Sequence, residues 1–347
     1  MTAQMNSKLI RDPRIDPRIK AIFAGPDRPP VGDIASREAL LAEANSPEAL
    51  AADAAAASFF DTCDTEANAP SAGLSIRTDR FTSAPDGNEI KVAITRPDTP
   101  ERVACVVYFH GGGMQIQSCF NGAHKAWGRI IAAQGVAVVM VDFRNSLVPS
   151  SAPEVLPFPA GLNDCVSGVK WTHANADALN IDPARIVVAG GSGGANLTLA
   201  TGLKLLRDGD IGLVRGLYAS APYIAGRWPH PDCPSSVEDN GILLDLHNNR
   251  GAMAYGLDAF ERRDPLAWPA FATEADVKGL PPTIISVNEC DPLRDEGVNF
   301  YRLLLRAGVP ARCRQLMGTT HSVEVLSMAC PDISRDAAAD LARFARR

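Results

Sequence analysis

Apolar and polar residues follow several different periods along this chain of 347 residues. Leucine and alanine recur at roughly helical spacing over residues 34–60, which predicts one or two amphipathic helices that dock on a larger body. The period then changes to two, because residues 75–81 and 89–95 alternate apolar and polar side chains around Asp86-Gly87. This pattern predicts an antiparallel hairpin at the edge of a sheet.

Continuous apolar runs alternate with helical patterns in the rest of the chain. Strands are predicted over residues 104–109, 136–141, 186–189, 213–219, 283–287 and 312–316, and helices over residues 126–133, 162–173, 196–206, 298–306 and from 333 onward. Such alternation is typical of an α/β fold with a parallel sheet and right-handed crossovers. Residues 222–271, rich in Pro, Trp, Tyr and Asn, are too long for a simple connection and predict an insertion near the carboxyl ends of the strands, where ligands bind.

Composition and charge narrow the class of function. The chain is 46% hydrophobic and 21% charged, as in ordinary globular proteins, and its net charge of −6 without a basic cluster argues against a nucleic-acid partner. Residues 1–20 lack the apolar segment of a secretion signal, and the run 136–141 is too short to span a bilayer, so we expect a cytoplasmic protein without a membrane partner. Eight scattered cysteines without a C-x-x-C pair predict buried thiols rather than a metal or redox site.

The segment Gly190-Gly191-Ser192-Gly193-Gly194 lies between a predicted strand and a predicted helix. G-x-S-x-G in this context is a nucleophile elbow, a sharp turn that exposes a serine hydroxyl and that tolerates only glycine-sized neighbours. The five residues alone would also fit a phosphate-binding loop or an ordinary tight turn. Other chemistry-bearing residues must therefore distinguish these interpretations.

Three further features stand in the order that a serine hydrolase requires. His110-Gly111-Gly112-Gly113 directly follows a predicted strand, and consecutive glycines can turn backbone N–H groups toward a developing oxyanion. Asp291 follows the strand over 283–287, and His321, the one histidine beyond it in the sequence, follows the last strand. We favour Asp291 over Glu289 and Asp295 as the acid, because Asp295 and Glu296 suit the first turn of the next helix.

With these motifs the chain resembles the hormone-sensitive-lipase branch of the α/β-hydrolases, the bacterial carboxylesterase group, over roughly residues 74–347. The resemblance rests on HGGG at 110–113, GGSGGANL at 190–197, DPLRDEG at 291–297, Thr320-His321, and FPA at 158–160 with Asp164. It implies an α/β-hydrolase fold with a mostly parallel central sheet, a catalytic core over 74–221 and 272–347, and a helical cap. The cap would comprise the N-terminal segment 1–73 and the insertion 222–271.

The resemblance also implies a role for each matching residue. Ser192 would be the nucleophile, His321 the general base and acid, and Asp291 the group that orients His321. The oxyanion hole would comprise the N–H groups of Gly112, Gly113 and Gly193, while His110 and Gly111 would support that loop. No metal or organic cofactor is expected, and a homodimer is plausible for this family.

Departures from the family pattern occur beside the nucleophile and after the second parallel strand. The family usually has an acidic residue at Gly191, a small residue such as alanine at Gly193 and glycine at Ala195, and it has YRLAPE where this chain has Phe143-Arg144-Asn145-Ser146. We expect these departures to alter rate or substrate range. The other histidines at 124, 173, 230 and 247 are interpreted as surface or packing residues.

The hypothesis that follows is a carboxylesterase for short to medium acyl esters, acting through an acyl-enzyme. An amidase, an arylformamidase or a lactonase would use the same triad, so the motifs leave these alternatives open. A non-catalytic receptor for a small molecule is the alternative from another class, but such a protein is expected to have lost a member of the triad.

Overall fold

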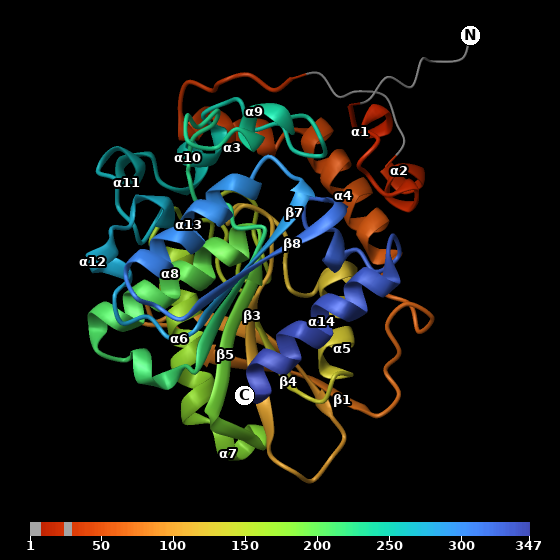
Figure 1. The fold of residues 1–347 in the computed structure, drawn as a ribbon, viewed down its shortest axis with the longest axis vertical. Coiled ribbons are helices and arrows are strands. Elements are labelled where there is room, and N and C mark those ends of the chain that lie inside the picture. Colours follow the sequence, from red (N-terminus) through yellow and green to blue (C-terminus); the bar gives the residue numbers. More distant parts are fainter. Residues whose placement is uncertain (1–7, 24–29) are drawn as a thin grey trace.

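The computed structural model describes residues 8–23 and 30–347, which form one eight-stranded sheet of order β1-β2-β4-β3-β5-β6-β7-β8 (Figure 1). Strand β2 pairs antiparallel with β1 and β4, and all other pairs are parallel. The bounds are β1 Leu74–Thr82, β2 Glu89–Pro97, β3 Val103–Phe109, β4 Ala137–Val141, β5 Ile181–Gly191, β6 Gly216–Ser220, β7 Thr283–Cys290 and β8 Ala311–Thr320. The predicted hairpin and the predicted parallel sheet are confirmed.

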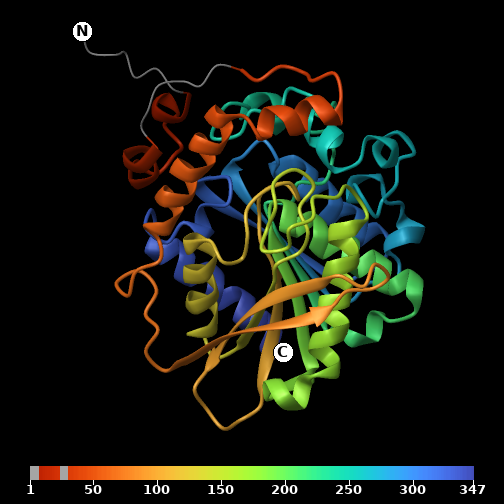
Figure 2. The ribbon, with the colours of Figure 1, turned by 180° about the vertical axis from the view of Figure 1, so that it is seen from behind.

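Helices cover both faces of the sheet (Figures 1 and 2). One face is covered by α6 Ala160–Ala174, α8 Gly193–Asp208 and α13 Arg294–Arg306. The other face is covered by α5 Gly122–Ala132 and α14 Pro331–Arg346. A short helix, α7 Ala176–Leu179, leads into β5. Strands β3 and β4 are buried on both faces, which explains why their sequences are continuously apolar rather than alternating.

Several predicted boundaries differ from the structure, and two of these differences have a clear local cause. The strand predicted over 213–219 begins only at Gly216, because Ile211–Leu213 form a 3-10 turn before it. The helix predicted over 298–306 already begins at Arg294, whose N–H donates to the carbonyl of Asp291 at 3.0 Å. The first turn of α13 therefore starts directly after the loop that holds Asp291.

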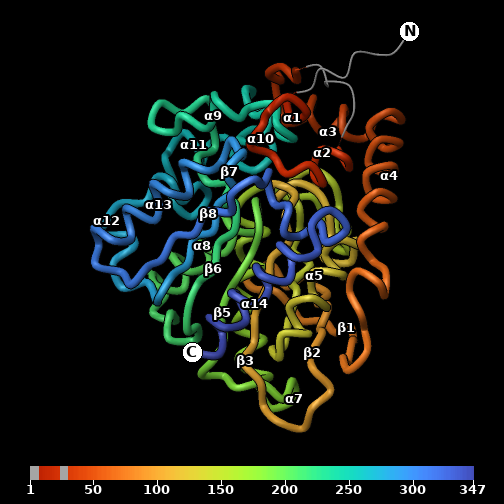
Figure 3. The backbone as a smooth tube through the Cα atoms, turned by 45° about the vertical axis from the view of Figure 1, so that its right-hand side comes forward, coloured from red at the N-terminus to blue at the C-terminus, as the bar shows by residue number. Residues whose placement is uncertain are grey.

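Most of the remaining helices lie over the carboxyl ends of the parallel strands, whereas α4 Pro47–Asp61 and α12 Glu274–Val277 lie at the sides of the molecule (Figures 1 and 3). The others are α1 Lys8–Arg11, α2 Pro17–Phe23 and α3 Arg37–Ala44 from the N-terminal segment, and α9 Ser235–Glu238, α10 Arg250–Tyr255 and α11 Leu257–Glu261 from residues 222–271. Helix α3 contacts α10, and Arg250 pairs with Glu43 at 2.8 Å. The division into segments 1–73 and 222–271 stays a prediction, and residues 1–7 and 24–29 lie outside the described part.

Helix α4 differs from the amphipathic helix predicted for this stretch. None of its residues is buried, although Phe59 and Phe60 at its end are half-buried. Most of its alanines are exposed. The helix runs along the side of the molecule (Figure 3). No helix in the described ranges is long and apolar enough to cross a membrane.

Candidate active site

Ser192 is held at the turn between β5 and α8 in a conformation that few residues adopt. Its backbone has φ 56° and ψ −120°, and its N–H donates to Ser220 O at 2.9 Å. A Cβ at Gly190 would lie 2.3 Å from Gly194 O, and one at Gly194 would lie 2.0 Å from Phe109 O. The flanking glycines are therefore required by close backbone contacts, and the elbow predicted from G-x-S-x-G is formed.

The three side chains predicted to form a triad are in one hydrogen-bonded row. His321 Nδ1 donates to Asp291 Oδ2 at 2.8 Å, and the Ser192 hydroxyl lies 2.9 Å from His321 Nε2. Asp291 follows β7 and His321 follows β8, so neighbouring parallel strands bring residues 30 positions apart together. Asp291 is fully buried and also accepts the N–H of Leu293 at 2.9 Å, which holds its carboxylate in place.

Two carboxylates influence the charge of His321. Burial lowers the pKa of His321, but Asp291 and then Glu324 raise it by more, so that its pKa lies above the ordinary value of 6.5. Glu324 lies in the turn after His321, is 2% exposed, and accepts a hydrogen bond from Asn288 Nδ2 at 3.3 Å. A second buried acid beside the histidine was missed from the sequence, because a lone Glu gives no motif.

The glycine loop after β3 lies against the first turn of α8. A Cβ at Gly193 would lie 2.7 Å from Gly113 N, and Gly112 and Gly113 have φ +100° and +64°. Within the described part of the chain, the N–H groups of Gly112 and Gly113 donate to no other group, and the N–H of Gly193 begins a helix, where it has no intrahelical acceptor. A Cβ at Gly111 would lie 3.6 Å from Ser192 Cβ, so the loop borders Ser192.

His110 holds this glycine loop in place through a hydrogen bond. It is fully buried, its Nδ1 donates to Gly111 O at 2.8 Å, and its ring stacks on Phe143 with centroids 4.2 Å apart. Burial lowers the pKa of His110, which favours the neutral ring. His124, interpreted as a packing residue, is buried near it, and burial lowers the pKa of His124 to about 3.

Two buried polar side chains hold residues 222–271 against the core. Both lie inside the GGSGGANL and DPLRDEG motifs, which did not indicate this role. Asn196, on α8, donates from Nδ2 to the carbonyls of Tyr223 and Ala267, each at 3.0 Å. Glu296 accepts the N–H of Ile224 at 2.6 Å and the indole N–H of Trp228 at 2.7 Å. Glu296 does lie in the first turn of α13, as predicted, but its carboxylate holds the insertion.

Arg144, in the FRNS segment after β4, supports the fold. Arg144 is 2% exposed and its Nε donates to buried Asp164 at 2.9 Å, while its other nitrogens reach Asp86 and Glu154. Asp164 also accepts the hydroxyl of Ser83 at 2.6 Å. This cluster connects the β1–β2 hairpin to α6. Removing either partner of such a buried ion pair would leave the other charge buried without compensation, which is strongly destabilising.

The cysteines and the acidic residues give no metal-binding arrangement. All eight cysteines are free, and seven of them are buried while Cys313 is half-buried. Across residues 8–23 and 30–347, no three side chains from His, Cys, Asp and Glu are grouped so that they could hold a metal ion.

Comparisons with known proteins place this geometry in a family. Residues 106–325 match the model of the alpha/beta hydrolase fold. Esterase Est22, solved with p-nitrophenol, is 63% identical with a TM-score of 0.96, and the match covers 98% of this chain and 99% of that one. Brefeldin A esterase, a bacterial homologue of human hormone-sensitive lipase, is 34% identical with a TM-score of 0.84, covering 97% and 95%.

A curated relative agrees with these structures. Carboxylesterase NlhH of Mycobacterium tuberculosis (strain ATCC 25618 / H37Rv) is 34% identical over 217 residues, which are 61% of this chain. The match spans 64% of that relative's own length. This chain belongs to the α/β-hydrolase fold family, in the branch of the hormone-sensitive-lipase homologues.

Proposed function

We propose that this protein is a serine carboxylesterase that hydrolyses short to medium acyl esters through an acyl-enzyme. The observation that carries the proposal is the hydrogen-bonded row from Ser192 through His321 to Asp291, with distances of 2.9 and 2.8 Å. A serine hydroxyl becomes nucleophilic when an adjacent base takes its proton, and here the base is itself oriented by a carboxylate. The names of the related esterases support the same reaction.

Each step uses a group already in position. The Ser192 hydroxyl attacks the ester carbonyl while His321 Nε2 accepts its proton, and Asp291 stabilises the imidazolium that forms. Negative charge then develops on the carbonyl oxygen, toward which the N–H groups of Gly112, Gly113 and Gly193 donate. His321 returns the proton to the departing alcohol, and a water molecule activated by the same ring releases the acid.

The acyl range is argued from the covering layer and from relatives. Residues 222–271 and helices α1–α3 lie over the carboxyl ends of the strands (Figure 1). We expect this covering layer to limit the length of the acyl group. Est22 was solved with p-nitrophenol, the alcohol of the p-nitrophenyl esters, so this ester series is a suitable probe. The free state of all eight thiols supports our further proposal that the protein works in the reducing cytoplasm.

The test compares two serines that both approach His321. Ser192→Ala should lower kcat for p-nitrophenyl butyrate on the order of 10⁴-fold or more, because nothing then attacks the carbonyl. Ser322→Ala is the matched control, since its hydroxyl lies 3.4 Å from His321 Nε2, and it should retain activity within about tenfold. Activity of Ser192→Ala equal to that of wild type would refute the assignment, and a series from acetate to laurate would define the acyl range through kcat/KM.

A further inference from the structure

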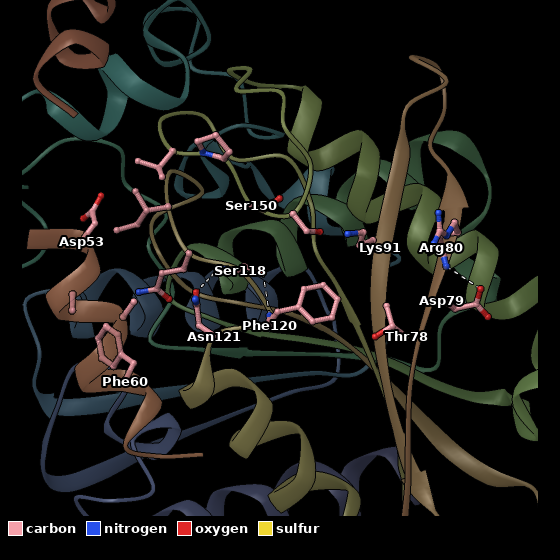
Figure 4. Close-up of a pocket in the computed structure, with 17 residues that line it drawn as sticks. Asp53, Phe60, Thr78, Asp79, Arg80, Lys91, Ser118, Phe120, Asn121 and Ser150 are labelled. Carbon is pink, nitrogen blue, oxygen red and sulfur yellow. Dashed lines mark hydrogen bonds between the residues drawn. The ribbon is translucent and has the colours of Figure 1, made fainter. Parts of the chain in front are cut away.

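A cavity lies on the side of the molecule, and the triad does not line it. It has a volume of about 750 Å³ and opens between α4, the edge strands β1 and β2, and the loops that follow β3 and β4 (Figure 4). Neither the triad residues nor the glycines of the oxyanion loop line it. Cavities of about 300–1,000 Å³ are the size that holds a small molecule.

One side of this cavity is apolar. Helix α4 contributes Ala56, Ala57 and Phe60, and the loops contribute Ile116 and Val148. These side chains come from segments that are far apart in the sequence, and Ala56 is one of the exposed alanines of α4. The wall suits a flexible hydrocarbon chain, because small side chains and one aromatic ring offer contact area without hydrogen-bonding groups.

The opposite side carries two positive charges. Arg80 of β1 and Lys91 of β2 are directly opposed in the antiparallel register, so their side chains share a face of the sheet. Like charges opposed in this way destabilise a sheet. Arg80 is paired with Glu89 at 3.1 Å, but across residues 8–23 and 30–347 the Lys91 ammonium has neither an ion pair nor a hydrogen bond.

Glu89 neutralises Arg80, so the Lys91 ammonium is the charge that stays without a partner in the described part of the chain. Asp79 also lines the cavity, and its Oδ1 accepts the backbone N–H of Arg80 at 2.9 Å. Asp53 lies on α4, across the cavity from the strands, whereas Lys91 extends from β2 toward Ser150 (Figure 4). An anion beside Lys91 would thus be separated from Asp53 by the width of the cavity.

The loops of the cavity are continuous with the oxyanion loop. Ile116 N donates to Gly112 O at 3.1 Å. Ser118 Oγ and Ser151 N both donate to buried Asp142, each at 2.7 Å, and Asp142 Oδ1 lies 3.8 Å from His110 Nε2. A ligand in the cavity would therefore contact segments that are hydrogen-bonded to the support of the active site.

We propose that this cavity binds a monocarboxylate with a medium-length apolar chain. The carboxylate pairs with Lys91, beside the Arg80–Glu89 ion pair, and the chain lies along Ala56, Ala57 and Phe60. A single negative group fits the one unpaired cation with an acid at the far side, whereas a neutral lipid would leave Lys91 unpaired and a polyanion would meet Asp53. The site is separate from the proposed ester hydrolysis, and its occupancy requires no turnover.

The experiment measures octanoate binding to the full chain by isothermal titration calorimetry. Lys91→Met should weaken binding at least about tenfold, the effect of losing one charge-assisted contact, and Ala57→Trp should weaken it similarly by filling the apolar side. Arg77→Met removes a cation from the other face of β1, and Ala55→Trp places the same indole on the opposite side of α4. Both controls should bind octanoate as wild type does.

Three results would overturn the proposal. They are a lack of octanoate binding to wild type at millimolar concentration, unchanged affinity in both Lys91→Met and Ala57→Trp, and equal affinity for octanol or for inorganic phosphate. The last result would indicate a purely apolar or a purely anionic site. Thermal melts establish that each variant is folded. If Ala57→Trp is unstable, the affinity of Lys91→Met alone tests the proposal, because Lys91 is exposed and its replacement does not disturb the core.

Discussion

The indole Nε1 of Trp228 donates a hydrogen bond to Glu296 Oε2 at 2.7 Å. Glu296 is five residues beyond Asp291, and Trp228 belongs to the inserted segment, so this bond joins the layer above the strands to the helix that begins beside the triad. Both residues are buried. The covering layer and the segment that follows Asp291 are therefore parts of one packed unit.

Replacing Trp228 by phenylalanine should destabilise the protein because a buried carboxylate oxygen then loses its donor. We expect the free energy of unfolding in urea to fall by about 1–3 kcal/mol more than in Trp268→Phe. Trp268 is the matched control, since it is also buried and, within the described residues, its indole N–H has no hydrogen-bond partner. Equal losses in the two variants would show that the hydrogen bond contributes nothing.

Stability should depend on pH through Glu296. Burial raises the pKa of Glu296 to about 8, although its N–H donors favour the ionised form. The folded state therefore binds this proton more tightly than the unfolded state, and the resulting stabilisation is complete below 4.5 and is lost as the pH rises through about 8. The unfolding free energy of wild type minus that of Glu296→Gln should decrease between these pH values, and a constant difference would contradict this expectation.

Activity should have an acid limb that reports His321. The ring must be neutral to accept the serine proton, and because its pKa is raised above 6.5, kcat/KM should fall as the pH drops through a value higher than that. Asp291→Asn should lower kcat by about 10⁴-fold and move the limb to lower pH, since it removes the larger of the two raising carboxylates. Glu324→Gln should move the limb in the same direction with a much smaller loss of kcat, which pH profiles of all three proteins would measure.

The glycines of the elbow should not be equivalent. A Cβ at Gly194 would lie 2.0 Å from Phe109 O, which is backbone and cannot move aside, so Gly194→Ala should cost more than about 3 kcal/mol or prevent folding. At Gly191 the nearest atom is Tyr108 Oη at 3.2 Å, and Gly191→Ala should stay within about 1 kcal/mol of wild type. Denaturant titration of both variants would check the contrast. Similar stabilities would mean that the backbone at Gly194 can relax.

The local pattern of the chain was sufficient for most of the fold. Whether a strand alternates or is continuously apolar depends on whether one or both of its faces are buried, and the hydrophobicity of each residue indicates this burial. Residues 75–81 and 89–95 alternate, whereas β3 and β4 are continuously apolar. The start of α13 was misplaced because it depends on a hydrogen bond to Asp291 O, which hydrophobicity does not report. Boundaries are set by such local bonds.

The order of Ser192, Asp291 and His321 could likewise be read from motifs, because each residue follows a strand and glycines mark the turns that expose it. Long-range pairing of isolated polar residues could not be read in this way. Glu296 with Trp228 and Asn196 with Ala267 meet only when strands and helices pack, since a single buried acid or amide carries no periodic signal. The sequence by itself identifies the reactive residues, because glycine-rich motifs mark the turns that expose them. The partners of single polar side chains are decided only by the tertiary structure, because it brings distant segments into contact.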